Sequence, residues 1–352
     1  MKTFAHDPGT TRVVAHARPH LIVIAALFVA CGDSGADATT TTTTSNGGGG
    51  GTSSTTTAGG GGATSSNGGG GAATTTSSTG GGGATGAGGM SPAPVRLVAG
   101  NVSSGSGQSY NLGHGIRILK GTRGDVFMVQ EFNYGANDAA ALQSFADQIC
   151  GTECTAVRGP TEQIPNGVIS RYPILDSGSV TDPYVTNRNF VWAHIDVPGP
   201  TDLYAFSVHL LTSSATQRQN EAVALNAAIG DVVMDPDAFI VVGGDLNTEN
   251  RTENALLTLA DNFVIGSPWP IDQDLNDFTN APRNKPFDWV LVNPALDALA
   301  VPTVIGANGF PGGLVVDTRV YDPISDLSPA LATDSAANSM QHMAIVKDFQ
   351  LE

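Results

Sequence analysis

The sequence predicts one large folded domain of mixed α/β or α+β class with substantial β-sheet. Three observations support this prediction. The composition changes near residue 93 from a Thr, Ser, Gly and Ala tract to ordinary mixed sequence. About 260 residues follow, which is enough for a sizeable single core. Within them, stretches of strand length outnumber helical stretches, and helices interrupt the strands.

Eight stretches alternate or run apolar over the length of a strand, so we expect each of them to form a β-strand. The first four run over 95–101, 125–131, 166–172 and 190–197, and the second four over 203–210, 238–245, 287–293 and 343–349.

Two segments are predicted to be helices. The first covers 136–149, in the sequence ANDAAALQSFADQI. The second begins after Ser214, where Ala222, Leu225 and Ile229 recur at steps of three and four residues. That spacing places the three apolar side chains on one face of a helix.

The N-terminal third predicts export and a tether. Residues 1–31 contain Arg12 and Arg18 and then an apolar run, Leu21 to Val29, which is too short to span a bilayer and suits a signal peptide. The run ends in a sequence that resembles a bacterial lipobox, with Cys31 as the lipidated residue, although Phe28 departs from the usual Leu. An uncleaved or differently cleaved signal is the alternative. Residues 32–92 read as a flexible tether, and 93–352 as the catalytic domain.

Two further cysteines agree with an exported domain. Cys150 and Cys154 are four residues apart, close enough to pair if the segment is a tight loop. Zinc is the weaker alternative, because no further Cys or close His pair completes a set of four ligands. We therefore expect a local clamp and not a catalytic centre.

The formal net charge of −16 belongs almost entirely to the predicted domain, because acidic and basic residues cancel in the first 90 residues. A surface of this sign repels polyanions on average. A phosphate substrate would therefore need a local site or a bound cation, and tight non-specific binding of nucleic acid is disfavoured.

Polar residues recur at the ends of the predicted strands, where they can converge on one edge of a sheet. Taken singly, each has an ordinary structural explanation as a turn residue, a solvated strand end or a hydrogen-bonded core histidine. The GGDLNT stretch is more specific, because two glycines permit close backbone approach beside two oxygen-bearing side chains. These residues are Asn101, Glu131, His209, Asp245, Asn247, Asp288 and His342.

The order of these motifs resembles the endonuclease/exonuclease/phosphatase superfamily. The motifs are GN (100–101), VQE (129–131), SRYPI (170–174), SVHL (207–210), GGDLNT (243–248), FDWVL (287–291) and a closing QH (341–342). The resemblance spans nearly the whole domain. It implies an α+β fold with four layers, an αββα sandwich of two packed sheets flanked by helices, and a site at one end of the sheets. It also implies metal-assisted hydrolysis of a phosphate ester.

The resemblance implies a metal site with Mg²⁺ as the cofactor and Mn²⁺ or Ca²⁺ as alternatives. Glu131 corresponds to the glutamate that binds the cation, and Asn101 to its neighbour. The closing motif departs from the family, because Gln341 stands where an aspartate is usual. Three interpretations remain open: Gln341 is a neutral second ligand, Asp334 supplies the carboxylate, or the site is weakened.

The same resemblance implies the catalytic roles. Asp245 would orient or deprotonate the attacking water, Asn247 would hold a phosphate oxygen, and His209 would contact phosphate or donate a proton. Asp288 would fix the orientation of His342 and favour its protonated form. Hydrolysis of a phosphodiester develops negative charge on oxygen, which a hard cation and imidazolium or amide donors offset.

Four further residues are candidates for substrate binding, with ordinary surface ion pairs as the alternative. They lie just before two predicted strands, where a guanidinium could reach a phosphate. Arg171 of the SRYPI motif is expected to be structural. The four candidates are Asn187, Arg188, Asn280 and Arg283.

The function predicted from the sequence is that of a metal-dependent phosphodiesterase, first of all a nuclease that acts on extracellular DNA or RNA. The alternatives are a lipid phosphodiesterase of the sphingomyelinase kind, a phosphatase for small phosphate esters, and a non-catalytic surface binding module on the same fold. We expect a monomer that is exported, either secreted or held at the cell surface or outer membrane, and that touches a membrane only through its lipid anchor.

Overall fold

The computed structural model describes residues 94–104, 110, 112–160 and 163–351. The predicted signal peptide, Cys31 and the predicted tether lie outside these residues. None of the helices in the described part of the chain is long and apolar enough to cross a membrane.

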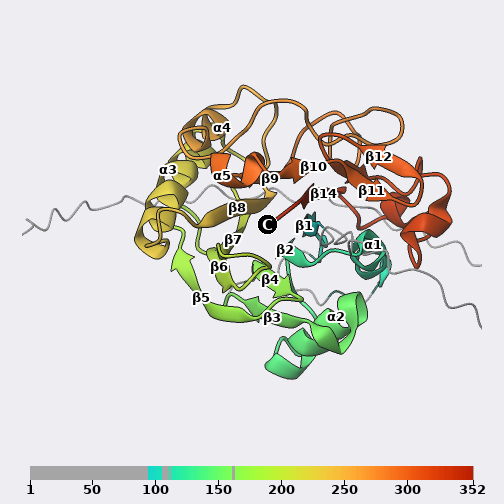
Figure 1. Ribbon diagram of the computed structural model, residues 1–352, viewed down its shortest axis with the longest axis horizontal. Helices are drawn as coiled ribbons and strands as arrows, with labels where there is room; N and C mark the ends of the chain where they lie inside the picture. The colour runs from blue at the N-terminus through green and yellow to red at the C-terminus, as the bar shows by residue number, and fades with distance from the viewer. Residues whose placement is uncertain (1–93, 105–109, 111, 161–162, 352) are drawn as a thin grey trace, which may run out of the picture. The chain divides into compact units, whose positions relative to one another are not determined.

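Two β-sheets lie face to face at the centre of the domain (Figure 1). The strand order of the first is β10-β14-β1-β2-β4-β3, with β13 also paired to β14. Its strands are β1 (Val95–Asn101), β2 (Val126–Gln130), β3 (Thr155–Arg158), β4 (Gly167–Ser170), β10 (Ala300–Val301), β13 (Leu314–Val316) and β14 (Ala344–Phe349).

The second sheet has the order β5-β6-β7-β8-β9, and β11 and β12 form a separate two-stranded ribbon. Its strands are β5 (Ile174–Thr181), β6 (Asn189–Ile195), β7 (Leu203–His209), β8 (Phe239–Asp245) and β9 (Asp288–Val292). The ribbon consists of β11 (Thr303–Ile305) and β12 (Asn308–Phe310).

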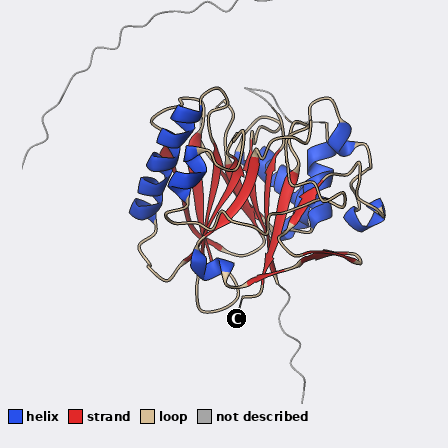
Figure 2. Ribbon diagram, turned by 90° about the horizontal axis from the view of Figure 1, so that it is seen from above, coloured by secondary structure: helices blue, strands red, loops and turns tan. Residues whose placement is uncertain are grey.

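Helices lie on both outer sides of the paired sheets (Figure 2). The α-helices are α1 (His114–Thr122), α2 (Ala139–Cys150), α3 (Ala215–Val232), α4 (Asn254–Leu259) and α5 (Pro294–Asp297). Short 3-10 turns are η1 (Gly151–Glu153), η2 (Ile324–Leu327) and η3 (Asp334–Ala336).

Three apolar clusters separate the layers. In β1, Val98 packs with α1 and α2 on the outer face of the first sheet, whereas Leu97 and Ala99 pack between the two sheets. On the far side, β7 and β8 pack against Leu225 of α3 and Leu256 of α4. Alternate residues of a strand point to opposite faces, so one strand serves two layers. The four-layer α+β sandwich that the sequence resemblance implied is therefore the observed fold.

The two glycines of the GGD stretch let the sheets approach closely near the site. A Cβ atom on Gly244 would lie 2.7 Å from the Nε2 atom of Gln130, and a Cβ on Gly243 would collide with Met128. Gln130 comes from the opposite sheet and donates from Nε2 to the hydroxyl of Ser207 at 2.9 Å. The glycines thus allow the strand ends of the two sheets to converge.

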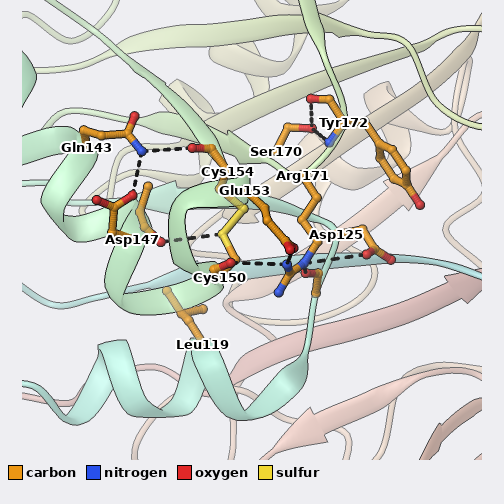
Figure 3. The surroundings of a disulfide bond; sticks show 12 residues. Leu119, Asp125, Gln143, Asp147, Cys150, Glu153, Cys154, Ser170, Arg171 and Tyr172 are labelled. Atoms are coloured by element: carbon orange, nitrogen blue, oxygen red, sulfur yellow. Dashed lines mark hydrogen bonds and ion pairs between the residues drawn. A yellow bond between two sulfur atoms is a disulfide. The ribbon is translucent and has the colours of Figure 1, made fainter.

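A disulfide joins Cys150, the last residue of α2, to Cys154, with Cα atoms 6.0 Å apart (Figure 3). Arg171 lies beside it and donates to the backbone carbonyls of Gly124 (3.1 Å) and Cys150 (3.3 Å). The expectation of a structural Arg171 agrees with these contacts, because its guanidinium ties two loops to the disulfide turn.

Candidate active site

The site forms where strand ends of both sheets meet. Strands β7 and β8 run parallel and β9 runs antiparallel to β8, and their register places His209, Asp245 and Asp288 in one row. In the opposite sheet, Asn101 ends β1 and Glu131 follows β2, which is parallel to β1. His342 lies two residues before the start of β14. Six strands therefore deliver polar side chains to one region.

The turns that follow three of these strands use left-handed backbone. Ser103 (φ 55°), Glu131 (φ 54°) and Asn247 (φ 51°) have positive φ although none is glycine. Such residues are uncommon and concentrate at functional sites, where surrounding structure holds them in place. The sharp turn that each makes leaves its side chain at the strand end.

Asp245 is the centre of the site. Its carboxylate is buried and accepts from Asn101 Nδ2 at 3.2 Å and from the backbone N–H of Asn247 at 2.9 Å. The Nε2 atoms of His209 and His342 lie 3.2 and 3.5 Å from its Oδ2 atom. Burial alone would raise the pKa of Asp245, but the two imidazoles outweigh burial and lower the pKa below its ordinary value. Asp245 is thus a carboxylate at neutral pH.

His342 is paired with two carboxylates. Its Nδ1 atom lies 3.0 Å from Asp288 Oδ2, and both side chains are buried. Burial favours the neutral ring, but the charges of Asp288 and Asp245 raise the pKa of His342 to about 10. Burial raises the pKa of Asp288 to about 6 despite the opposing effect of His342. At neutral pH the pair therefore consists of a carboxylate and an imidazolium.

His209 differs from His342 in charge. Burial lowers the pKa of His209 below its ordinary value, although Asp245 acts against this effect. Its Nε2 atom faces Asp245, and its Nδ1 atom has no hydrogen-bond partner among the residues that the structure describes. The site thus combines one neutral imidazole with one imidazolium.

Carboxylates in this site suit a hard divalent cation. Glu131 is half-buried, and its Oε1 atom accepts from Asn101 Nδ2 at 3.2 Å. Asp245, Asp288 and His342 also form a possible metal site, since one ligand atom from each lies within 4.8 Å of the others. Glu131, which the sequence resemblance implies as the metal ligand, is linked to this group through Asn101, whose amide donates to both Glu131 and Asp245.

The contacts of Asn101 place it between two carboxylates of the site. Its Nδ2 group donates to the carboxylates of Glu131 and Asp245, and its Oδ1 atom accepts from the backbone N–H of Ser103 at 2.7 Å. This network fixes the amide orientation, and Oδ1 keeps a second lone pair. Asn101 thus positions the two carboxylates, and its expected role as a metal ligand stays a prediction.

Gln341 and Asp334, the two candidates for the missing aspartate, lie in different surroundings. Gln341 is exposed, and its backbone N–H donates to Ser103 Oγ at 3.2 Å. Asp334 is buried, and both of its carboxylate oxygens accept from the guanidinium of Arg117. The structure therefore does not bring Asp334 to the metal site, because Arg117 neutralises it elsewhere.

Arg188 is the strongest of the four substrate-binding candidates. Its side chain is 4% exposed, and its Nε atom has no hydrogen-bond partner among the described residues. Burial lowers its pKa, while the nearby carboxylates, Asp245 first among them, act in the opposite direction. A buried guanidinium without a fixed partner is suited to receive a phosphate oxygen.

The other three candidates differ in their contacts. Arg283 forms ion pairs with Asp272 and, at 3.1 Å, with Asp317, and its side chain is 10% exposed. Asn280 accepts from the backbone of Asn284 and Lys285. Asn187 is half-buried and receives the backbone N–H of Ile164 on its carbonyl oxygen. The role of these residues in substrate binding stays a prediction: Arg283 is held by two carboxylates although its Nη1 atom has no hydrogen-bond partner among the described residues, and Asn280 forms an isolated β-bridge with His342.

Asn247 keeps part of its expected capacity. Its side chain is buried and donates from Nδ2 to the carbonyl oxygen of Leu210 at 3.0 Å. An amide nitrogen has two N–H groups, so a second donor remains for a phosphate oxygen.

Two buried acids beside Arg188 escaped the sequence analysis. Glu221 of α3 is fully buried, and Asp182 lies between β5 and β6. A signal for Glu221 was present, because Arg218 and Glu221 occupy the same helical spacing as the apolar Ala222 and Leu225. Charged residues on the buried stripe of a helix need partners, and Arg218 finds one in Glu253 at 2.5 Å.

A four-layer sandwich with this row of carboxylates and imidazoles at its sheet ends is the architecture of a hydrolase. The model of the Endonuclease/Exonuclease/phosphatase family matches residues 109–326. The chain therefore belongs to this family and is a phosphoesterase by membership.

Solved structures with a similar fold include an endonuclease/exonuclease/phosphatase family protein from Leptotrichia buccalis, with 14% identity and a TM-score of 0.50. The alignment covers 72% of this chain and 99% of that one. Truncated TDP2 from Caenorhabditis elegans has 14% identity, a TM-score of 0.49 and coverage of 73% and 97%. The human Nocturnin catalytic domain has 14% identity, a TM-score of 0.49 and coverage of 73% and 94%. A comparison with curated proteins gave no match.

Proposed function

We propose that this protein is a metal-dependent phosphodiesterase that cleaves DNA or RNA outside the cytoplasm. The buried guanidinium of Arg188 carries the proposal, because its Nε atom has no hydrogen-bond partner among the described residues and Asp245 is the carboxylate that acts on it most strongly. A guanidinium that faces a carboxylate-rich centre without a fixed partner suits a phosphate whose hydrolysis takes place beside it. Nuclease activity is chosen because two of the three activities in the family's name act on nucleic acid.

Each side chain has a role in this proposal. A divalent cation held by Glu131 would offset the charge that develops on the phosphate oxygens. Asp245 orients the attacking water, since its low pKa makes it an acceptor of hydrogen bonds more than a base. His342, as an imidazolium held by Asp288, donates to a phosphate oxygen. Arg188 binds a second oxygen and Asn247 a third.

Export is proposed from the N-terminal sequence and the disulfide. Structural disulfides persist in oxidising compartments, and Cys150 and Cys154 form one. Lipidation at Cys31 and the long tether would hold the domain at a membrane surface. Labelling the expressed protein with a palmitate analogue tests this, and a Cys31→Ser variant should lose the label and appear in the soluble fraction.

The function is tested by turnover of four substrates with the full chain. Supercoiled plasmid, a single-stranded RNA, a choline-phosphate lipid and a small phosphate monoester are each incubated with EDTA, Mg²⁺, Mn²⁺ or Ca²⁺. We expect nicking of plasmid or cleavage of RNA that requires the cation and disappears in Asp245→Ala. Faster turnover of the lipid or of the monoester would replace the nuclease proposal. No turnover of any substrate with any cation would favour a binding module.

A further inference from the structure

The acids Asp182 and Glu221 form a buried pair behind the phosphate-binding guanidinium. Glu221 is fully buried on α3, and both of its carboxyl oxygens accept from the backbone N–H of Leu211, at 3.1 and 3.0 Å. Asp182 is 2% exposed, and its Oδ1 atom accepts from the N–H of Tyr184 at 2.8 Å. Both carboxyls therefore have fixed positions.

The two carboxyls contact each other. A hydrogen bond joins the Asp182 and Glu221 side chains. Two ionised carboxylates repel and cannot bond in this way, so the contact requires one proton between them. The Oδ2 atom of Asp182 supports this assignment, since it is buried and no N–H or hydroxyl of the described residues reaches it. A carboxyl proton from Glu221 supplies the missing donor.

Arg188 lies close enough to sense the charge of both acids. Asp245, Glu221, Glu131 and Asp182 all act electrostatically on its guanidinium. Among the described residues it nevertheless forms no ion pair with either acid, and its Nε atom has no hydrogen-bond partner there. The two acids bind each other in preference to the arginine.

We propose that Glu221 is a positioning residue: in its protonated form it hydrogen bonds to Asp182, which keeps the charge of Arg188 available to an incoming phosphate. The proposal rests on the proposed function for the identity of the phosphate, but its geometry is independent of turnover. Ionised Glu221 would place a second carboxylate beside Arg188, and that carboxylate would compete with the phosphate for the guanidinium.

The surroundings of Glu221 agree with a neutral side chain. Burial, the largest effect, and the neighbouring Asp182 raise the pKa of Glu221 to about 8, against the backbone N–H of Leu211 and the charge of Arg188. The charged groups that face it are Asp182 from the connection before β6 and Arg188 at the start of β6. On its own helix, Arg218 is neutralised by Glu253. The acid pair is therefore expected to bind one proton at pH 7.

Sulfate binding tests the proposal without turnover, because the charge of sulfate does not change between pH 7 and pH 9.5. Calorimetry with the full chain at fixed Mg²⁺ gives Kd for the wild type and for Glu221→Gln. Glutamine is nearly isosteric with protonated Glu, since its carbonyl accepts from Leu211 and its amide donates to Asp182. We expect equal Kd values at pH 7 and about fivefold weaker binding by the wild type alone at pH 9.5.

Two further variants keep the test decisive. Asp182→Asn removes the carboxylate that helps to keep the proton on Glu221, so its Kd ratio between pH 9.5 and pH 7 should be smaller than that of the wild type. In an Arg188→Gln background, adding Glu221→Gln should no longer change that ratio, since the effect acts through Arg188.

The possible results separate the two proposals. If sulfate affinity falls between pH 7 and pH 9.5 by the same factor in the wild type and in Glu221→Gln, the proposed role of Glu221 is overturned. The proposed hydrolysis is not affected by that result. The expected sulfate pattern without hydrolysis of any phosphate ester would support the role of Glu221 and sink the nuclease proposal. Turnover assays in parallel should show the same pH dependence in KM and not in kcat.

Discussion

At the residue scale, the two histidines of the site show how position sets protonation. His342 touches two carboxylates and His209 one, and both rings are buried. At His342 the second carboxylate raises the pKa enough to overcome the effect of burial. At His209 burial outweighs the single carboxylate and keeps the ring neutral. One imidazolium and one neutral ring therefore arise from the same residue type.

The metal site gives the first prediction. Replacement of Glu131 by Ala should reduce kcat/KM by at least about a hundredfold, because it removes the carboxylate that we propose as the metal ligand. Gln341→Asp should preserve or tighten the Mg²⁺ dependence, since Gln341 is exposed and an added carboxylate can only strengthen cation binding. Mg²⁺ titrations of initial rates measure both effects. Glu153→Ala, at an exposed carboxylate beside the disulfide, is the control. A Glu131→Ala enzyme with normal Mg²⁺ response would refute this assignment.

The two arginine candidates give the second prediction. Arg188→Ala should raise KM by about tenfold or more, because a charge-assisted contact to phosphate is lost. Arg283→Ala should leave KM unchanged but lower the free energy of unfolding by about 3 kcal/mol, because buried Asp272 loses its ion pair and Asp317 keeps only the ion pair with Arg319. Steady-state kinetics and urea unfolding separate the two. A raised KM in folded Arg283→Ala would restore it as a substrate contact.

Much of the site was predictable from the sequence because its residues follow apolar strands directly. Asp245 and Asp288 are examples, since each sits at the end of a strand with a clear pattern. The hydrogen-bond and ion-pair partners of the charged residues were not predictable. Whether Arg283 meets a phosphate or Asp317 depends on contacts between residues 34 positions apart, and a list of charged residues does not contain that information.

At the scale of elements, strands with strong patterns were predicted to within a few residues. Strand β1 was predicted over 95–101 and observed there, and β8 was predicted over 238–245 and begins one residue later. Helix α1 was missed, because its sequence HGIRILKGT contains two glycines and no N-cap side chain. Short strands such as β10 and β11 were missed as well. Their pairing partners, and not their own sequence, define them.

The disulfide turn after α2 gives the third prediction. Replacing both Cys150 and Cys154 by Ser should lower the free energy of unfolding by about 2 kcal/mol, the loop-closure value for so short a loop. Activity should be unchanged, because the contacts of the turn are with Arg171, which is not one of the site residues (Figure 3). Urea unfolding with and without reductant measures the effect: the wild type should respond to reductant and the variant should not.

At the scale of the whole molecule, the layers follow from strands that are apolar on both faces. The burial of β1 and β2 is nearly complete along their length, which is the pattern of strands covered on two sides. Two such sheets need helices on their outer faces, and α1, α2, α3 and α4 provide them. The sequence pattern alone predicts extensive sheet. The pairing of two sheets followed only from the family resemblance, because strand order is set by long-range contacts.

The stability of the domain should depend on pH through Glu221. The folded-state pKa of about 8 lies above the ordinary value of 4.5. A carboxyl whose pKa is raised by folding stabilises the fold fully below its unfolded pKa, and this contribution is lost as pH rises towards the folded pKa. Between about pH 4.5 and pH 8 the wild type should therefore lose about 2 to 4 kcal/mol relative to Glu221→Gln. Urea unfolding at pH 5, 6.5, 8 and 9 gives the difference between the two proteins, in which other titrating groups cancel. That difference should grow up to pH 8 and then stay constant. A difference that is the same at pH 5 and pH 9 would mean that Glu221 is ionised throughout, and the shared proton with Asp182 would have to be abandoned.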